Sequence, residues 1–190
     1  LGVAAGKSDT LFRRNYLTGL TVLGLYELEE AGLMPSSSEP LPKELSYLSP
    51  LLKAAAGGNS MDMVLTSVFT HWGDALAEET EKALIDRGFA TETVHKGIFG
   101  IQTRRLTADS PPADAWRKNL LTATPDQEAI LLTWVLEKTG LLEDCLGKEP
   151  AQELRRSLTA PKNVSVCKTL ERADQIYDIA LAVLATFSLT

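Results

Sequence analysis

Two pairs of adjacent arginines are the residues of this sequence best suited, by type and spacing, to bind an anion. Arg13 and Arg14 come just before a predicted first helix, and Arg104 and Arg105 lie where a predicted hairpin returns. A guanidinium group can hold two oxygens of one phosphate through parallel hydrogen bonds, so such pairs suit a phosphate-bearing ligand. The alternative is that all four arginines lie on the solvated surface and pair with nearby acids.

A short apolar run before the second arginine pair suits a different kind of contact. Ile98, Phe99 and Ile101 lie together with two glycines in residues 97–101. At the tip of a hairpin, this run would dock onto a membrane or a partner chain. The alternative is that it packs in the core, against a predicted helix that contains Trp116.

The one pattern that suggests nucleotide binding is incomplete. Residues 2–8 read Gly-Val-Ala-Ala-Gly-Lys-Ser, with three residues between the glycines where a phosphate-binding loop needs four. We therefore expect residues 1–9 to be a disordered or capping N-terminal segment. An enzyme that holds a nucleotide with Lys7 and Ser8 is the remaining catalytic hypothesis.

The histidines and cysteines are too far apart to predict a metal site. His71, His95, Cys145 and Cys167 include no pair at the Cys-x-x-Cys or His-x-x-x-His spacing that a tetrahedral metal requires. No Gly-x-Ser-x-Gly motif presents a serine nucleophile either. We therefore predict no metal, no cofactor and no catalytic residue.

The overall charge disfavours nucleic acid as a partner. The 190 residues include 19 basic and 25 acidic side chains, a net charge of −6, so any anion site must be local. The longest uncharged apolar stretch, residues 179–189, is about half of the ~20 residues that span a bilayer. No secretory signal is visible, and two cysteines make no disulfide framework. We expect a cytoplasmic protein that can associate with a membrane surface.

Helix signals recur along most of the chain. Apolar residues at helical spacing run through residues 15–30 and again from Ser60 to Trp72. Helices are expected to end at Gly32, Gly88 and Gly140, because glycine readily adopts the left-handed conformation that closes a helix.

One segment has the composition of strands rather than helices. Residues 89–106 are rich in Thr, Val and Ile and predict a β-hairpin, with a turn at His95-Lys96-Gly97. The last helix begins near Asn163 and is apolar on nearly all faces from Ile179 to Phe187, which is typical of a central helix. The sequence therefore predicts a mainly α fold, a single helical domain over residues 1–190 around a central apolar C-terminal helix, with a protruding β-hairpin.

Several short motifs occur in an order that resembles a known family. In chain order they are Gly19-Leu20, Glu27-Leu28, Gly32, Leu84 to Phe89, Glu92, Gly97 to Gly100 and Thr103 to Leu106. Together they resemble the Golgi phosphoprotein 3 family, including its bacterial members. The resemblance extends more loosely through the C-terminal helix and so covers almost the whole chain.

This resemblance implies an all-helical peripheral membrane adaptor, not an enzyme, that binds phosphatidylinositol 4-phosphate. It also implies a hairpin used in membrane contact or self-association and, in eukaryotic members, recognition of the cytosolic tails of Golgi glycosyltransferases. The family's lipid pocket uses a tryptophan before the first helix, an arginine within it and two arginines on the helix before the hairpin. Ungapped matching places Phe12, Thr21, Asp74 and Ala77 at these positions.

The four matched positions change what the resemblance implies about the lipid. Three guanidinium groups are lost, each hydrogen bond to a charged group contributing about 1.5–3 kcal/mol, and Asp74 adds repulsion of a phosphate headgroup. Phe12 keeps an aromatic side chain, and Arg13 and Arg14 could hold a headgroup from another direction. The predicted lipid-binding residues are therefore Phe12, Arg13 and Arg14, and the predicted membrane or partner contacts are Ile98, Phe99, Ile101, Arg104 and Arg105.

Two functional hypotheses follow from these residues. The first is a peripheral membrane adaptor that binds a phosphoinositide or another anionic lipid. The second is a soluble bacterial interaction protein of the same fold that has lost phosphoinositide binding and forms a homo-oligomer through the hairpin.

Overall fold

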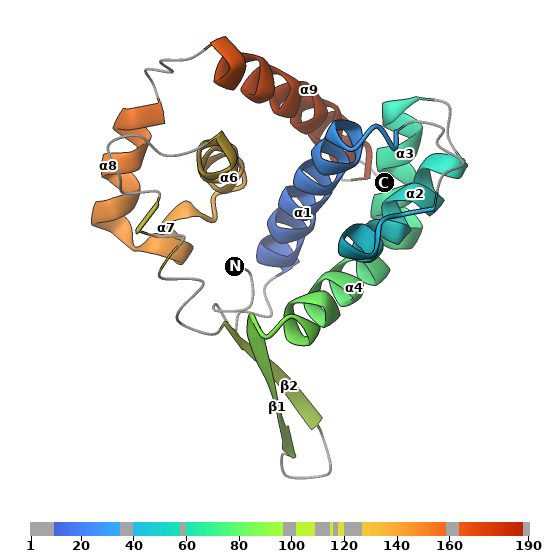
Figure 1. Cartoon of the computed structure of the whole chain (residues 1–190), viewed down its shortest axis with the longest axis horizontal. Coiled ribbons are helices and arrows are strands. Elements are labelled where there is room, and N and C mark those ends of the chain that lie inside the picture. The colour runs from blue at the N-terminus through green and yellow to red at the C-terminus, as the bar shows by residue number, and fades with distance from the viewer. Residues whose placement is uncertain are drawn as a thin grey trace.

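Helices form most of the described chain, and a two-stranded hairpin projects from them (Figure 1). The computed structural model describes residues 10–34, 40–57, 60–96, 102–108, 115, 118–119, 127–158 and 164–187. The elements are α1 (Thr10–Glu30), the 3-10 helix η2 (Lys43–Leu48), α2 (Ser49–Ala56), α3 (Met61–Ser67), the π-helix η3 (Val68–Trp72), α4 (Gly73–Asp86), β1 (Ala90–Lys96), β2 (Gln102–Ala108), α6 (Gln127–Lys138), α7 (Leu142–Leu146), α8 (Lys148–Leu158) and α9 (Val164–Phe187). This confirms the predicted mainly α fold with a β-hairpin.

The predicted glycine helix ends are confirmed. Gly32, Gly88 and Gly140 have φ angles of 70°, 72° and 72°. After Gly32, the backbone N–H of Leu33 donates to the carbonyl of Leu28 at 2.9 Å, and the same bond follows the other two glycines. These bonds satisfy carbonyl groups that have no partner inside the helix.

Helix α1 is the centre of the bundle. Its Val22, Leu25 and Leu28 have no exposed surface, and it packs against α2, α4, α6 and α9. Gly24 allows α2 to come close, because a Cβ at this position would lie 2.6 Å from a methyl group of Leu51. Helix α1 therefore packs against neighbours on several sides, with the closest approach at Gly24.

The prediction that the C-terminal helix is central was wrong. Leu181 and Phe187 of α9 remain 44% and 41% exposed, while Ala180 and Val183 face the core. The apolar run from Ile179 is rich in alanine, which favours a helix without needing burial on every side. Lack of charge in this run therefore does not require a central position.

The hairpin is confirmed, with different ends. β1 and β2 pair antiparallel from Ala90 opposite Ala108 to Lys96 opposite Gln102. The predicted turn at His95-Lys96-Gly97 was wrong, because β1 continues as a paired strand through Lys96. Residues 97–101, with Ile98, Phe99 and Ile101, connect the strands in sequence and lie outside the described residues. We call residues 90–108 the arm.

Helix α1 begins earlier than predicted. It starts at Thr10, so Arg13 and Arg14 lie within its first turns instead of before it. No glycine or proline lies between Thr10 and Asn15, so the helical propensities of this segment are consistent with the earlier start of α1. The predicted disordered segment, residues 1–9, lies outside the described residues.

Candidate functional site

The arm carries positive charge on an otherwise acidic chain. It contains Lys96, Arg104 and Arg105 against the single acid Glu92, which gives a net charge of +2 in a chain whose total is −6. The rest of the chain therefore carries −8. This separation favours contact between the arm and a negatively charged surface.

The arm also reaches well beyond the helices. Its seven-residue strands extend over about 20 Å at the rise of an antiparallel strand. Val94 is 52% exposed on β1, and Phe89 at the base is 43% exposed. The backbone of Arg104 lies opposite Val94. Apolar and basic residues thus share one projecting element (Figure 1).

The two predicted arginine pairs lie at the same end of the molecule. The first turns of α1, which contain Arg13 and Arg14, lie at the end from which the arm projects (Figure 1). The Arg14 side chain is exposed, and its backbone carbonyl accepts a hydrogen bond from Thr18 Oγ1 at 2.8 Å. Phe12 and Arg13 are described only in their backbone.

The positions that match the family's lipid pocket do not form an anion site. Thr21 is fully buried, and its hydroxyl donates to the carbonyl of Leu17 at 2.8 Å. Asp74 is exposed in the first turn of α4, and Ala77 is half-buried one turn later. No guanidinium group occupies any of the three, so a phosphoinositide would have no charged donor there.

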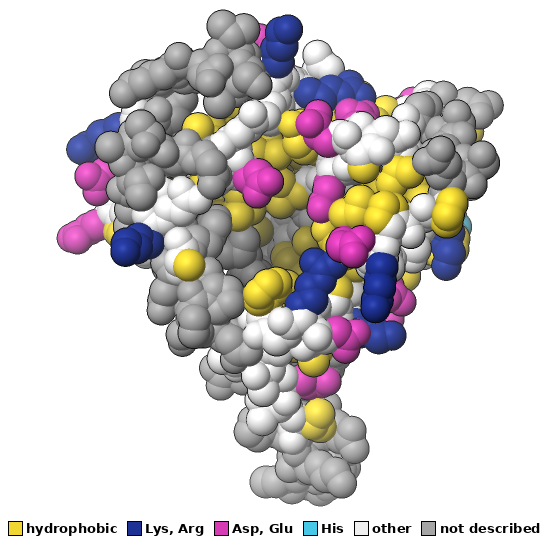
Figure 2. Space-filling view, in the orientation of Figure 1, with side chains coloured by type: hydrophobic (Ala, Val, Ile, Leu, Met, Phe, Trp, Pro, Cys, Tyr) yellow, Lys and Arg dark blue, Asp and Glu magenta, His cyan; other side chains and the backbone are white. Residues whose placement is uncertain are grey.

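A cleft of about 600 Å³ lies among α1, η2, α4, α6 and α9. Its apolar lining includes Leu20 and Leu23 from α1 and Leu131 from α6. Figure 2 shows a hollow between the α6 side and the α1 side of the molecule, with hydrophobic side chains in it and both acidic and basic side chains around it. Cavities of this size commonly hold small ligands.

The polar lining of the cleft is acidic. It includes Glu27, Glu30 and Glu128, and no lysine or arginine among the described residues lines it. Glu27 accepts a hydrogen bond from the Tyr47 hydroxyl at 2.5 Å. Burial, and then the bond to Glu27, raise the pKa of the Tyr47 phenol well above its ordinary value, so Tyr47 stays a neutral donor.

Two basic side chains near the cleft already have partners. Glu29 is paired with Arg172 of α9, whose Nε and Nη2 lie 2.8 and 2.5 Å from the two carboxylate oxygens. Arg172 therefore joins α1 to α9 outside the cleft. Arg87 lies over the ring of Tyr47, 5.5 Å from its centre, and does not line the cleft.

A hydrogen-bonded group fixes one wall of the cleft. Thr169 Oγ1 of α9 accepts a bond from Gln127 Nε2 at 2.5 Å and lies 3.2 Å from the hydroxyl of Tyr26. These three residues come from α6, α9 and α1. The wall is therefore held by side chains far apart in sequence.

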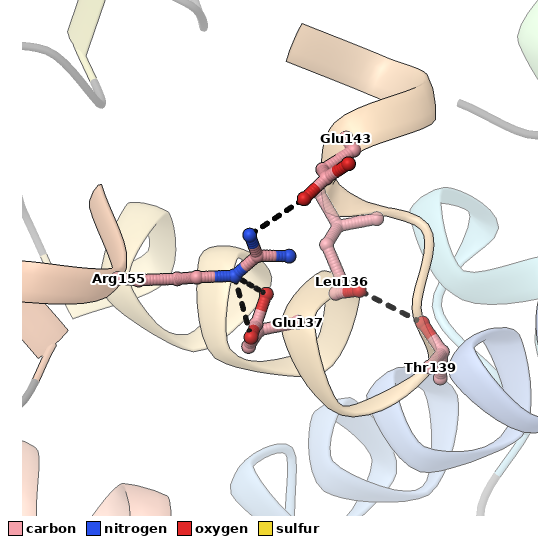
Figure 3. Close-up of polar contacts among 5 residues, drawn as sticks. All are labelled: Leu136, Glu137, Thr139, Glu143 and Arg155. Carbon is pink, nitrogen blue, oxygen red and sulfur yellow. Dashed lines mark hydrogen bonds and ion pairs between the residues drawn. The ribbon is translucent and has the colours of Figure 1, made fainter. Parts of the chain in front are cut away.

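A second polar group holds the far end of α6. Arg155 of α8 donates through Nε to both carboxylate oxygens of Glu137, at 2.7 and 2.8 Å, and through Nη1 to Glu143 at 2.7 Å (Figure 3). Thr139 Oγ1 caps the helix by donating to the carbonyl of Val135 at 2.8 Å. The contacts fix α6, α7 and α8 to one another and leave the guanidinium group no role in the cleft.

The described part of the chain offers few residues for other kinds of site. The described ranges contain no group of three or more His, Cys, Asp or Glu side chains that could hold a metal ion. Cys145, on α7, is half-buried and forms no disulfide with a described residue. No helix in the described part of the chain combines the length and apolar character needed to cross a bilayer.

The cleft residues were missed by the sequence analysis. They come from five elements, and no spacing in the sequence brings them together. The one local signal is the acidic end of α1, with Glu27, Glu29 and Glu30 and no basic residue in its last turn. Acids are unfavourable there, because the C-terminal end of a helix is itself partly negative.

Comparisons with protein-family models, with curated proteins and with solved structures find no match for this chain. The resemblance to the Golgi phosphoprotein 3 family therefore stays a prediction.

Proposed function

We propose that this chain is a non-catalytic peripheral membrane adaptor that binds an anionic lipid surface through the arm. The observation that carries the proposal is the net charge of +2 on a projecting element of a chain whose total is −6. Each basic residue near an anionic leaflet contributes about 1 kcal/mol to binding, and the acidic remainder of the chain is repelled. The arm is thus the part of the molecule that an anionic surface attracts.

The apolar residues of the arm supply the second component of binding. Ile98, Phe99 and Ile101 follow Lys96, whose backbone lies at the end of the arm far from the helices (Figure 1). Two signals are needed for stable attachment, because charge alone or one short apolar group alone binds weakly. Arg13 and Arg14 belong to the first turns of α1, at the same end of the molecule, and add two positive charges to that end.

The lipid surface is recognised by its charge and not by one headgroup. A phosphoinositide-specific pocket needs charge-assisted donors, and Thr21, Asp74 and Ala77 provide none. We therefore propose binding to anionic lipids in general, with phosphatidylinositol 4-phosphate bound according to its charge.

Co-sedimentation with vesicles tests this proposal. The protein is expected to sediment with phosphatidylserine-containing vesicles, to remain in solution with pure phosphatidylcholine, and to dissociate as the salt concentration rises. Vesicles with phosphatidylinositol 4-phosphate at the same surface charge should bind with the same affinity. Tighter binding to that lipid would contradict the lack of headgroup selectivity.

The alternative function makes the opposite prediction. If the chain is a self-associating protein, no vesicle type will bind it, and its mass in solution will rise with concentration. The substitution Phe99→Asp would then abolish the association. This combination of results would overturn the membrane adaptor proposal.

A further inference from the structure

We propose that the cleft among α1, η2, α4, α6 and α9 binds a small organic cation that carries a hydrocarbon chain. The cationic head would lie at Glu27 and Glu30, and the chain would lie along the leucines of α1 and α6. This inference does not depend on the membrane function of the arm, which projects elsewhere from the molecule.

The apolar part of the cleft suits a hydrocarbon chain. Its lining includes five leucines from three elements: Leu20 and Leu23 of α1, Leu131 and Leu132 of α6, and Leu48 of η2. Apolar surface that stays in contact with water favours any occupant able to cover it, by about 25 cal/mol for each Å² that is buried. A purely hydrophilic cation would leave this part of the cleft wet.

The charged part of the cleft suits a cation. Among the described residues, no hydrogen bond or ion pair is found for the Glu30 carboxylate, and that of Glu27 accepts one from the neutral hydroxyl of Tyr47. Both carboxylates lie in the last turn of α1, where the helix C-terminus adds partial negative charge. Glu128 is in the first turn of α6, whose positive end offsets its charge. The least compensated negative charge is therefore at the α1 end.

The surroundings of these carboxylates strengthen the attraction of a cation. Arg172, the nearby base on α9, is held by Glu29 in a two-bond ion pair and so does not neutralise Glu27 or Glu30. Tyr26 also lines the cleft, and aromatic faces attract organic cations, whereas the ring of Tyr47 already lies under Arg87. Negative charge, the Tyr26 ring and a leucine-lined cavity together select a cation with an apolar tail over an anion or a neutral amphiphile.

Calorimetric titration with octyltrimethylammonium tests the proposal, since this probe has one fixed positive charge and one short chain. Three matched probes separate the components: octanoate has the chain with a negative charge, octyl glucoside has the chain without charge, and tetramethylammonium has the charge without the chain. Of the four probes, we expect only octyltrimethylammonium to show saturable binding. Equal binding of octanoate or octyl glucoside would overturn the proposal, as would no binding of octyltrimethylammonium.

Substitutions locate the site. Glu27→Gln/Glu30→Gln removes both charges, keeps a hydrogen-bond acceptor for Tyr47, and is expected to lower affinity by about tenfold or more. Glu153→Gln, at an exposed position on α8 away from the cleft, is the matched control and should bind as the wild type does. Unchanged affinity in the double variant, with its thermal unfolding also unchanged, would show that the cation binds elsewhere. Vesicle binding of the double variant should not fall, which keeps this test separate from that of the arm.

Discussion

Arg104→Glu/Arg105→Glu is expected to weaken binding to phosphatidylserine vesicles by roughly 2–4 kcal/mol, or roughly 30- to 1,000-fold. Both residues lie in β2, and reversing them changes the net charge of the arm from +2 to −2. The attraction that we propose would become repulsion, added to that of the acidic helices. Vesicle titration at low salt measures the effect.

The matched control reverses two basic residues outside the arm. Lys43→Glu/Lys148→Glu changes the total charge by the same amount, and both lysines are exposed, on η2 and α8. We expect this variant to lose much less affinity than the arm variant. Equal losses would mean that binding depends on total charge and not on the arm. Far-ultraviolet circular dichroism checks that both variants remain folded.

Between pH 10 and pH 12, the free energy of unfolding of Tyr16→Phe is expected to fall by about 2 kcal/mol less than that of the wild type. Burial, with a smaller contribution from the negative charge of Glu81, raises the pKa of Tyr16 from 10.0 to about 12. In this range the unfolded chain releases the phenol proton and the folded chain keeps it. The stabilisation is therefore complete below pH 10 and is lost as the pH rises through the folded value.

Tyr16 interacts with two parts of the helical bundle. Tyr16 packs with the apolar cluster of α6, α7 and α8, while Glu81 belongs to α4, the helix that leads into β1. Chemical unfolding at pH 9 and at pH 12 measures the difference for the wild type and for Tyr16→Phe. A tyrosinate absorbance titration should show one fewer high-pH transition in the variant. An identical pH dependence in the two proteins would contradict the burial of this phenol.

Local signals in the sequence predicted most of the secondary structure. Gly32, Gly88 and Gly140 end helices because their backbone conformation is set within a few residues. The hairpin was predicted from its composition, but the turn predicted at His95-Lys96-Gly97 was wrong, since strand pairing through Lys96 depends on the partner strand.

Packing between distant segments could not be predicted in the same way. The exposure of Leu181 on α9 and the central position of α1 depend on which helices meet, and an apolar run gives no direct sign of this. The cleft combines Glu27, Tyr47 and Thr169, from elements that local periodicity does not relate. The predicted arm residues are neighbours in the sequence, so a local pattern was enough to propose them, and they stay a prediction.

The most direct test of the account measures whether the arm enters the membrane. Phe99→Trp adds a fourth tryptophan to the three of the wild type, and Met63→Trp, on the exposed surface of α3, is the matched control. With phosphatidylserine vesicles that contain brominated lipid, we predict a blue shift and quenching of the emission added at residue 99, and no change in the emission added at residue 63. Quenching at residue 63, with residue 99 unaffected, would contradict the account.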